Sequence, residues 1–286
     1  MKIIKKYIYT IITKLGITLY TKKQKRIIYK LNNKVTNKLD SVIFFTTHKC
    51  ASNFTNEILK KVEENSDFTL YDYGALIGSL SDRLKISLDF ENYLNNNYDH
   101  LFYPYGEIYG PQRKPLNFVG VENYKKIFFF RDPRDILVSA YHSFGFTHPT
   151  PNSKILSEEF IRNRNKIQQQ SIDDYVIEQA FKWIVPMFEN YKKIYDETQN
   201  KIYLKYDYYT SDTKSFLKEI FNYFDIIDEN CINQLHKISN PIQETTNENS
   251  HKRSGKSGQW KVSLSKETQI KLNKILLPIL RDWDFN

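Results

Sequence analysis

The sequence predicts a single α/β domain with a central parallel sheet flanked by helices. Three short runs rich in β-branched and aromatic residues are typical of buried strands, and each precedes a segment with apolar residues at helical spacing. A repeated order of strand and helix is typical of parallel strands joined by helical crossovers. The first strand leads into a loop and helix of the P-loop-like type. The three predicted strands are 42–45, 126–130 and 201–206.

Length and composition fit one globular domain. The 286 residues can form one large core, and 40% hydrophobic with 26% charged residues are typical of a soluble protein rather than a disordered or membrane-spanning chain. The formal net charge of +9 favours an anionic partner, either nucleic acid, a membrane surface or a phosphorylated small molecule. The two cysteines match no zinc pattern, so we expect a reducing, cytoplasmic location and no metal.

Residues 1–36 are predicted to form a basic amphipathic segment ahead of the main domain at 37–286. Isoleucines and leucines alternate with lysines through 2–34. The apolar stretch 7–20 is interrupted by Lys14 and is shorter than the ~20 residues of a membrane span, and no signal-peptide cleavage site follows it. Two interpretations stay open: a helix on an anionic membrane, which would make the protein membrane-associated, or a helix that packs on the domain.

The stretch 41–55 predicts an anion site. A strand at 42–45 ends in a small polar loop, and apolar residues resume at helical spacing in 56–62. Such a loop directs unpaired backbone N–H groups and the positive end of the helix dipole at its ligand. Cys50 is either a reactive thiol or, as its small neighbours favour, a space-filling residue. Side-chain donors in this stretch are Lys49, Ser52, Asn53 and Thr55.

A second junction of strand and helix carries a basic side chain at its mouth. The strand 126–130 runs directly into Arg131, and Asp132 followed by Pro133 is typical of a capped helix start. Arg131 at the strand end and Ser139 two turns into the helix are placed to bind one anion together. Arginine presents a planar fork of donors to such an anion, and serine adds a hydroxyl.

The remaining chain is predicted from its turn residues and helical patterns. Residues 66–125 form a less regular region, in which 98–113 crowds aromatic residues, glycine and proline as in a loop that lines a pocket. Residues 144–170 are a polar excursion that suits a mobile lid. Further helices are predicted at 172–195 with an interruption at Pro186, from Thr213 after a cap at Ser211 or Asp212, and at 266–280.

Three motifs, taken together, resemble the sulfotransferase family that uses 3'-phosphoadenosine 5'-phosphosulfate (PAPS). Lys49 to Phe54 (KCASNF) is similar to the family's loop of lysine, small residues, a hydroxyl residue and an aromatic residue. Arg131 to Ser139 (RDPRDILVS) matches the 3'-phosphate motif in its spacing and its centre. Arg253 to Lys261 (RSGKSGQWK) resembles the closing loop RKGxxGDWK, with serine and glutamine at two of its polar positions. The resemblance covers about residues 40–285.

The resemblance implies a role for each matching residue. Lys49, Ser52 and the loop backbone would hold the 5'-phosphosulfate, and Phe54 would stack on the adenine, because it offers the flat apolar face of the family's tryptophan. Arg131 and Ser139 would bind the 3'-phosphate. The implied cofactor-binding residues are Lys49, Cys50, Ala51, Ser52, Asn53, Phe54, Arg131, Ser139, Tyr206, Arg253, Ser254 and Gly255.

The implied reaction moves the sulfuryl group from PAPS to a hydroxyl of an acceptor, or as a second choice to an amine, by in-line displacement. Lys49 would neutralise the negative charge that develops on the departing bridging oxygen. The general base that would deprotonate the acceptor departs from the family pattern, because Tyr109 stands where many members carry histidine. Glu107 and His100 are the candidate bases, and the alternative for both is a purely structural role in the loop.

Two other functional classes fit parts of the sequence. A P-loop kinase or NTPase is suggested by Gly255 to Ser257, but Ser250 stands at the first glycine position of a Walker A motif and no strand precedes it. A non-enzymatic module for nucleic acid or membrane would explain the net charge, but no nucleic-acid motif is present. We therefore expect a small-molecule, glycan or lipid acceptor, no nucleic-acid partner, and membrane contact only through 1–34. The oligomeric state is not predicted.

Overall fold

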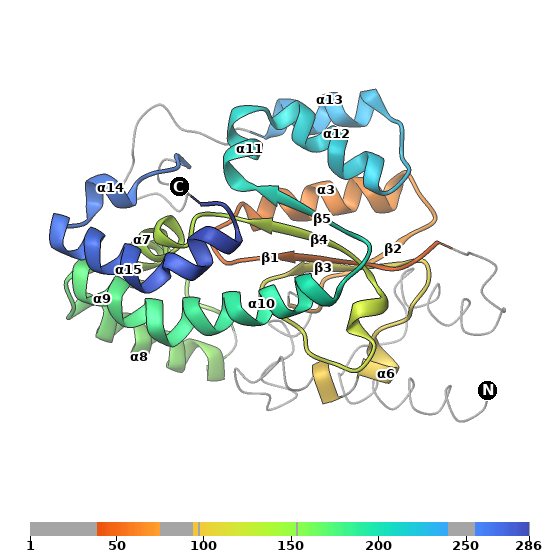
Figure 1. Cartoon of the computed structure of the whole chain (residues 1–286). Helices are drawn as coiled ribbons and strands as arrows, with labels where there is room; N and C mark the ends of the chain where they lie inside the picture. The colour runs from red at the N-terminus through yellow and green to blue at the C-terminus, as the bar shows by residue number, and fades with distance from the viewer. Residues whose placement is uncertain (1–38, 75–93, 97, 153, 240–254, 286) are drawn as a thin grey trace.

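The protein is described by a computed structural model over residues 39–74, 94–96, 98–152, 154–239 and 255–285 (Figure 1). The predicted basic segment 1–36 lies outside the described residues. The centre of the fold is a five-stranded sheet in the order β2-β3-β1-β4-β5, and its neighbouring strands are parallel. Helices cover both faces of this sheet (Figure 1). The predicted α/β class with a central parallel sheet is confirmed.

The three predicted strands are present as β1 (Val42–Thr46), β4 (Lys125–Phe130) and β5 (Lys201–Lys205). Two more strands, β2 (Thr69–Tyr71) and β3 (Glu107–Gln112), lie in the region predicted to be less regular. The prediction was wrong for β3 because Gly110 and Pro111, which disfavour strands, lie inside it. Gly110 is needed there, since a Cβ atom on it would lie 2.9 Å from the Cβ of Phe44. The stretch 98–113 is therefore mainly a buried strand and the segment that precedes it, not a loop that lines a pocket.

Side chains alternate between the two faces of the sheet along each strand, and each face forms a hydrophobic core. In β1, Ile43 and Phe45 face one core, whereas Val42 and Phe44 face the other. The second core lies under α3 (Ser52–Glu64), α12 (Thr213–Tyr223) and α13 (Glu229–Ile238), which share one face of the sheet in Figure 1. The first core lies under α7 (Pro133–His142), α9 (Ile172–Gln179), α10 (Val185–Glu197) and α15 (Lys266–Asp282).

The long helix predicted over 172–195 is present with the expected interruption. A π-helical turn, η3 (Ala180–Ile184), separates α9 from α10, and Pro186 lies in the first turn of α10. Proline there lacks the N–H that a continuous α-helix would use, so the chain relaxes into a wider turn. Residues 144–170 are more regular than the predicted excursion. They contain most of a second π-helical turn, η2 (Ser143–Thr147), and α8 (Lys154–Gln168).

Short helices complete the described fold: α6 (Tyr98–Leu101), η1 (Val121–Asn123), α11 (Tyr206–Ser211) and α14 (Trp260–Ser263). Within the described ranges no helix combines the length and the apolar character that a bilayer crossing requires. The carboxyl ends of β3, β1, β4 and β5 meet at one edge of the sheet, because these strands are parallel neighbours. The predicted motifs follow β1, β4 and β5 at this edge.

Candidate active site

The Lys49 loop, residues 47–51 between β1 and α3, has the backbone of an anion site. Lys49 and Ala51 take positive φ values of 67° and 46°, which turn the chain sharply before the helix. The N-terminus of α3 has no side-chain cap and no acidic residue in its first turn. By contrast, Asp132 caps α7 and Ser265 caps α15. The first N–H groups of α3 are thus left without a side-chain acceptor, as a helix N-terminus that binds an anion requires.

The ammonium of Lys49 is held at the site by a serine that sequence reasoning missed. Lys49 Nζ donates a hydrogen bond to Ser143 Oγ at 2.8 Å and lies 5.9 Å from the ring centroid of Phe144. Ser143 is buried and begins the η2 turn directly after α7. It stands four residues after the predicted phosphate ligand Ser139. That spacing places both serines on one helix face and was the signal available in the sequence.

Arg131 connects all three predicted motifs. Its Nη1 donates to the backbone oxygen of Lys49 at 3.2 Å, and its Nη2 donates to that of Lys256 at 2.8 Å. Arg131 is 6% exposed, and its guanidinium lies over the ring of Tyr206, 4.6 Å from the ring centroid. Within the described part of the chain, Arg131 Nε is buried and has no hydrogen-bond partner. A buried guanidinium with an unsatisfied N–H is suited to receive an anionic ligand.

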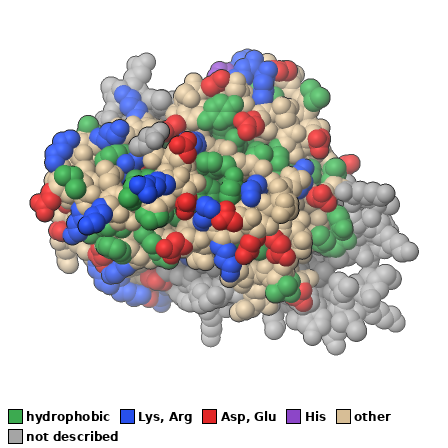
Figure 2. All heavy atoms as spheres, viewed as in Figure 1, with side chains coloured by type: hydrophobic (Ala, Val, Ile, Leu, Met, Phe, Trp, Pro, Cys, Tyr) green, Lys and Arg blue, Asp and Glu red, His purple; other side chains and the backbone are tan. Residues whose placement is uncertain are grey.

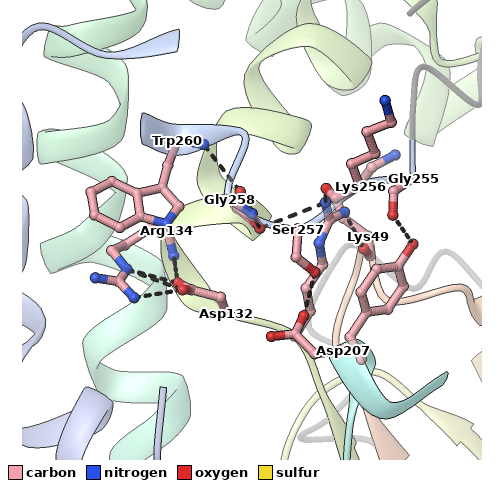
Figure 3. A network of polar contacts seen from close by, with 12 residues as sticks. Lys49, Asp132, Arg134, Asp207, Gly255, Lys256, Ser257, Gly258 and Trp260 are labelled. Atoms are coloured by element: carbon pink, nitrogen blue, oxygen red, sulfur yellow. Dashed lines mark hydrogen bonds and ion pairs between the residues drawn. The ribbon is translucent and has the colours of Figure 1, made fainter. Parts of the chain in front are cut away.

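The described part of the closing loop, residues 255–261, is fixed beside the ends of β4 and β5 (Figure 3). Gly258 N and Trp260 N donate to the two carboxylate oxygens of Asp135 at 2.7 and 3.1 Å, and Tyr206 Oη donates to Gly255 O at 3.0 Å. Burial raises the pKa of Asp135, and the charge of Arg131 opposes that rise. Asp135 therefore anchors the loop. The predicted ligands Arg253 and Ser254 lie outside the described residues.

Arg134, inside the second motif, has a structural role. Its guanidinium lies over the ring of Trp260 (Figure 3), 4.0 Å from the ring centroid, and donates to Asn273 Oδ1 at 2.8 Å. Asp132 accepts from it at 2.6 Å and also caps α7. These contacts join the start of α7 to the closing loop and to α15. Arg134 thus supports the tryptophan of the third motif.

The other predicted cofactor ligands lie along the Lys49 loop and its helix. Cys50 is fully buried, its Sγ donates to Phe129 O at 3.5 Å, and burial raises its pKa to about 12. It is therefore a neutral thiol, which suits the space-filling interpretation. Phe54 is half-buried in the first turn of α3 and stacks on Tyr209, with ring centroids 5.3 Å apart. Ser52 and Asn53 precede it in the same turn.

The structure does not bring the two predicted bases to Lys49. Glu107 begins β3 and donates its N–H to Ser41 Oγ, at the amino end of β1. At about 3.3 Å per residue, the length of β1 separates that end from the Lys49 loop by roughly 15 Å. His100 lies in α6, and the backbone just after α6 pairs with the same end, since Ser41 N donates to Pro104 O. The structure therefore places Glu107, and the backbone that follows α6, at the opposite end of β1 from the Lys49 loop.

Two other histidines lie beside Lys49, around the ring of Phe144. The ring centroid of His48 is 6.1 Å from that of Phe144 and 6.2 Å from that of Trp183, and His148 is 5.8 Å from Phe144. Burial lowers the pKa of His48 to about 3 and also lowers the pKa of His148. Both imidazoles are therefore neutral near pH 7. Sequence reasoning missed His48 although it directly precedes Lys49.

Several exposed basic side chains lie on α14 and α15, the helices that follow the closing loop. On the face shown in Figure 2, Lys and Arg side chains gather over α14 and α15. Such a positive surface attracts an anionic ligand toward the site. In the part of the chain that the structure describes, His, Cys, Asp and Glu side chains form no group of three that could bind a metal. The exposed basic residues of these helices are Lys261, Lys266, Lys271, Lys274 and Arg281.

A family model described as a sulfotransferase domain matches residues 39–284. The chain belongs to the sulfotransferase family. A mouse sulfotransferase, SULT7A1, solved in complex with PAP, matches with a TM-score of 0.51 over 86% of this chain and 85% of that chain, at 16% identity. Retinol dehydratase in complex with androsterone and inactive cofactor PAP matches with a TM-score of 0.48, over 86% and 82%, at 18% identity. No curated protein sequence matches the chain. The predicted family and enzyme class are confirmed.

Proposed function

We propose that this sulfotransferase moves the sulfuryl group of PAPS to a hydroxyl of its acceptor. The observation that carries the proposal is the position of Arg131, which bonds to the Lys49 loop and to the closing loop beside Tyr206. Hydrogen-bond donors that can bind anions therefore lie in two places with aromatic rings nearby. A nucleotide with anionic groups on both sides of its ribose requires such an arrangement. The PAP in the complexes of SULT7A1 and retinol dehydratase supports the same ligand class.

The residues present fit PAPS, which would supply the sulfuryl group when bound. The Lys49 ammonium and the N-terminal N–H groups of α3 would hold the 5'-phosphosulfate. Arg131 and Ser139 would hold the 3'-phosphate, and Arg253 would close over it. Phe54 would stack on the adenine through the face turned away from Tyr209, which already supports its other face.

Lys49 would act directly on the reacting group. Its ammonium would stabilise the negative charge that grows on the bridging oxygen as the bond to sulfur breaks. The hydrogen bond from Lys49 to Ser143 holds that ammonium at the mouth of the loop before reaction. Preorganisation of this kind lowers the barrier, because little reorientation remains when the acceptor attacks in line.

The base that we propose for the acceptor hydroxyl is His148. Its Nδ1 lies 2.8 Å from Pro149 O, and since a carbonyl can only accept, Nδ1 carries the proton and Nε2 is the basic nitrogen. Its backbone is fixed to the η2 turn, because His148 N donates to Ser143 O at 2.7 Å and Arg164 donates to His148 O. His48 is the weaker candidate, since a group with a pKa of about 3 accepts a proton poorly.

The test uses the full chain with radiolabelled PAPS and a panel of phenols, sugars, lipid alcohols and amines. We expect transfer to hydroxyl compounds and stabilisation by 3',5'-adenosine bisphosphate (PAP) without magnesium. His148→Gln should lower kcat strongly with the affinity for PAP unchanged, and His48→Gln serves as the matched comparison. Stabilisation only by ATP with magnesium, and no transfer from PAPS, would replace this proposal with the kinase alternative. Preferential transfer to amines would correct the acceptor group.

A further inference from the structure

The exposed side of α15 carries a stripe in which basic and aliphatic side chains follow one another along the whole helix. Its members are three or four residues apart, so they share one side of the helix. Ile270 and Leu277 are 72% and 43% exposed. The opposite side of α15 packs into the first core through Leu272, Leu276 and Ile279. The α15 stripe consists of Lys266, Ile270, Lys274, Leu277 and Arg281, all of them exposed.

The surface continues from α15 onto α14. Lys261 O accepts a hydrogen bond from Gln269 Nε2 at 2.9 Å, so α14 lies against the first turn of α15. Val262 on α14 is 81% exposed. Figure 2 shows hydrophobic side chains between Lys and Arg side chains in this region. We call the α15 stripe, together with Lys261 and Val262, the basic-aliphatic surface. It adjoins the proposed nucleotide site, because α14 begins at Trp260 of the closing loop.

The positive charge of this surface is not balanced by ion pairs. Within the described ranges, none of its Lys and Arg side chains forms a salt bridge. By contrast, Lys60 on α3 and Lys218 on α12, on the other face of the sheet, each pair with a glutamate. The acidic residues of α15 lie to one side of the stripe, because Glu267 and Asp282 are about 60° and 120° around the helix from Ile270. The stripe is therefore a line of cations interrupted only by aliphatic side chains.

Cations interleaved with exposed aliphatic side chains fit the surface of an anionic lipid bilayer. Anionic headgroups attract the cations, and aliphatic side chains enter the boundary between the headgroups and the acyl chains. The apolar stems of lysine and arginine can lie along this boundary while their charged ends stay among the headgroups. A nucleic acid would supply the negative charge but no apolar layer, and the stripe offers no aromatic ring on which a base could stack. The composition of the surface therefore favours a membrane.

We infer that the basic-aliphatic surface binds bilayers that contain anionic phospholipids. In this arrangement α15 lies along the plane of the bilayer, and the closing loop lies beside the headgroups. The buried side of α15 stays in the first core, so the helix rests on the membrane and does not cross it. The sequence predicted membrane contact only through 1–34, which makes this surface a separate contact. The inference does not depend on the proposed sulfuryl transfer.

A fluorescent probe at position 270 tests the contact in the full chain. Ile270→Cys is labelled with an environment-sensitive fluorophore, and Ile227→Cys is the matched control, because Ile227 is also exposed but lies between α12 and α13 on the other face of the sheet. Cys50 and Cys231 are buried, so the wild type should take up little label. On vesicles of phosphatidylglycerol and phosphatidylcholine, the emission should shift to shorter wavelength at position 270 and stay unchanged at position 227. Unchanged emission at position 270, even where the protein sediments with the vesicles, would overturn the inference.

Removal of charge tests the chemical class of the partner. The stripe variant combines Lys266→Gln, Lys274→Gln and Arg281→Gln. Sedimentation with the anionic vesicles should show its affinity reduced at least about tenfold, because each cation near such a membrane contributes about fivefold. The control variant removes the same net charge from α3 and α12 and should bind like the wild type. It combines Lys60→Gln, Lys214→Gln and Lys218→Gln.

Three outcomes would overturn the inference. Equal losses in the stripe variant and the control variant would show that net charge alone drives binding. Equal binding of the wild type to vesicles of pure phosphatidylcholine would exclude recognition of anionic headgroups. Binding to mixed duplex DNA that is lost in the stripe variant, without binding to vesicles, would assign the surface to nucleic acid.

Discussion

Lys49 and Ser143 are 94 positions apart in the sequence, yet the lysine ammonium donates a hydrogen bond to the serine hydroxyl at 2.8 Å. Ser143 thereby sets the position of the group that we propose acts on the departing oxygen. Ser143→Ala removes one hydrogen bond worth about 0.5 to 1.5 kcal/mol, so we expect kcat to fall about two- to tenfold with little change in the affinity for PAP. Ser139→Ala, one helical turn earlier, should weaken the affinity for PAP with little change in kcat. Steady-state kinetics and calorimetric titration with PAP measure both, and identical effects of the two variants would contradict separate roles.

Arg131→Ala should weaken PAP binding. The variant loses the buried guanidinium that connects Lys49 O to Lys256 O and that we propose binds the 3'-phosphate. Hydrogen bonds to charged groups contribute about 1.5 to 3 kcal/mol, which corresponds to a rise in Kd of about 10- to 150-fold. Adenosine 5'-monophosphate, which differs from PAP only in lacking the 3'-phosphate, is the matched ligand. Its affinity should change much less, and an equal loss for both ligands would show that Arg131 only supports the loops.

Asp135→Asn should also weaken PAP binding, but indirectly. Asp135 is fully buried and accepts two backbone N–H groups of the closing loop. An amide offers one acceptor oxygen in place of two, so one N–H of the loop loses its partner and the loop is held less firmly. We expect an increase of about tenfold in the Kd for PAP and faster proteolysis near 255–260. Asp228→Asn, which changes the cap of α13 on the other face of the sheet, is the control. Unchanged binding in Asp135→Asn would contradict the anchoring role.

Sequence reasoning identified the segments that meet at the carboxyl edge of the sheet, because each proposed nucleotide motif is contiguous and most follow a buried strand directly. The strands β1, β4 and β5, the cap at Asp132 and the residues Lys49 and Arg131 were all readable from local patterns. The acceptor side of the site was not predicted, because its residues come from separate elements. Ser143 and His148 come near Lys49 only when α7 and the η2 turn pack beside β1, and β3 was hidden by its glycine and proline. The position of Glu107 was not predicted for the same reason, because only the pairing of β3 with β1 places it at the end of β1 opposite to the Lys49 loop.

Lys126 predicts a pH dependence of stability that is unrelated to catalysis. Its side chain is fully buried, its Nζ donates to Tyr124 O at 2.9 Å, and burial lowers its pKa to about 7. An unfolded lysine has a pKa of about 10.4, so between these values the unfolded chain binds more protons than the folded one and stability rises with pH. The unfolding free energy should therefore rise more steeply from pH 7 to pH 10 in the wild type than in Lys126→Met. Urea titrations at each pH measure this, and parallel pH profiles would contradict a depressed pKa.

The most direct test of the account is the rate of sulfuryl transfer from radiolabelled PAPS by Lys49→Met, measured at saturating PAPS and acceptor. The variant keeps an unbranched side chain of similar length and removes the charge. We expect kcat to fall about 100- to 1000-fold, as is typical when a group that stabilises developing charge is removed, with PAP binding weakened far less. Transfer at close to the wild-type rate would contradict the placement of the departing oxygen at Lys49, and with it the assignment of this edge of the sheet as the active site.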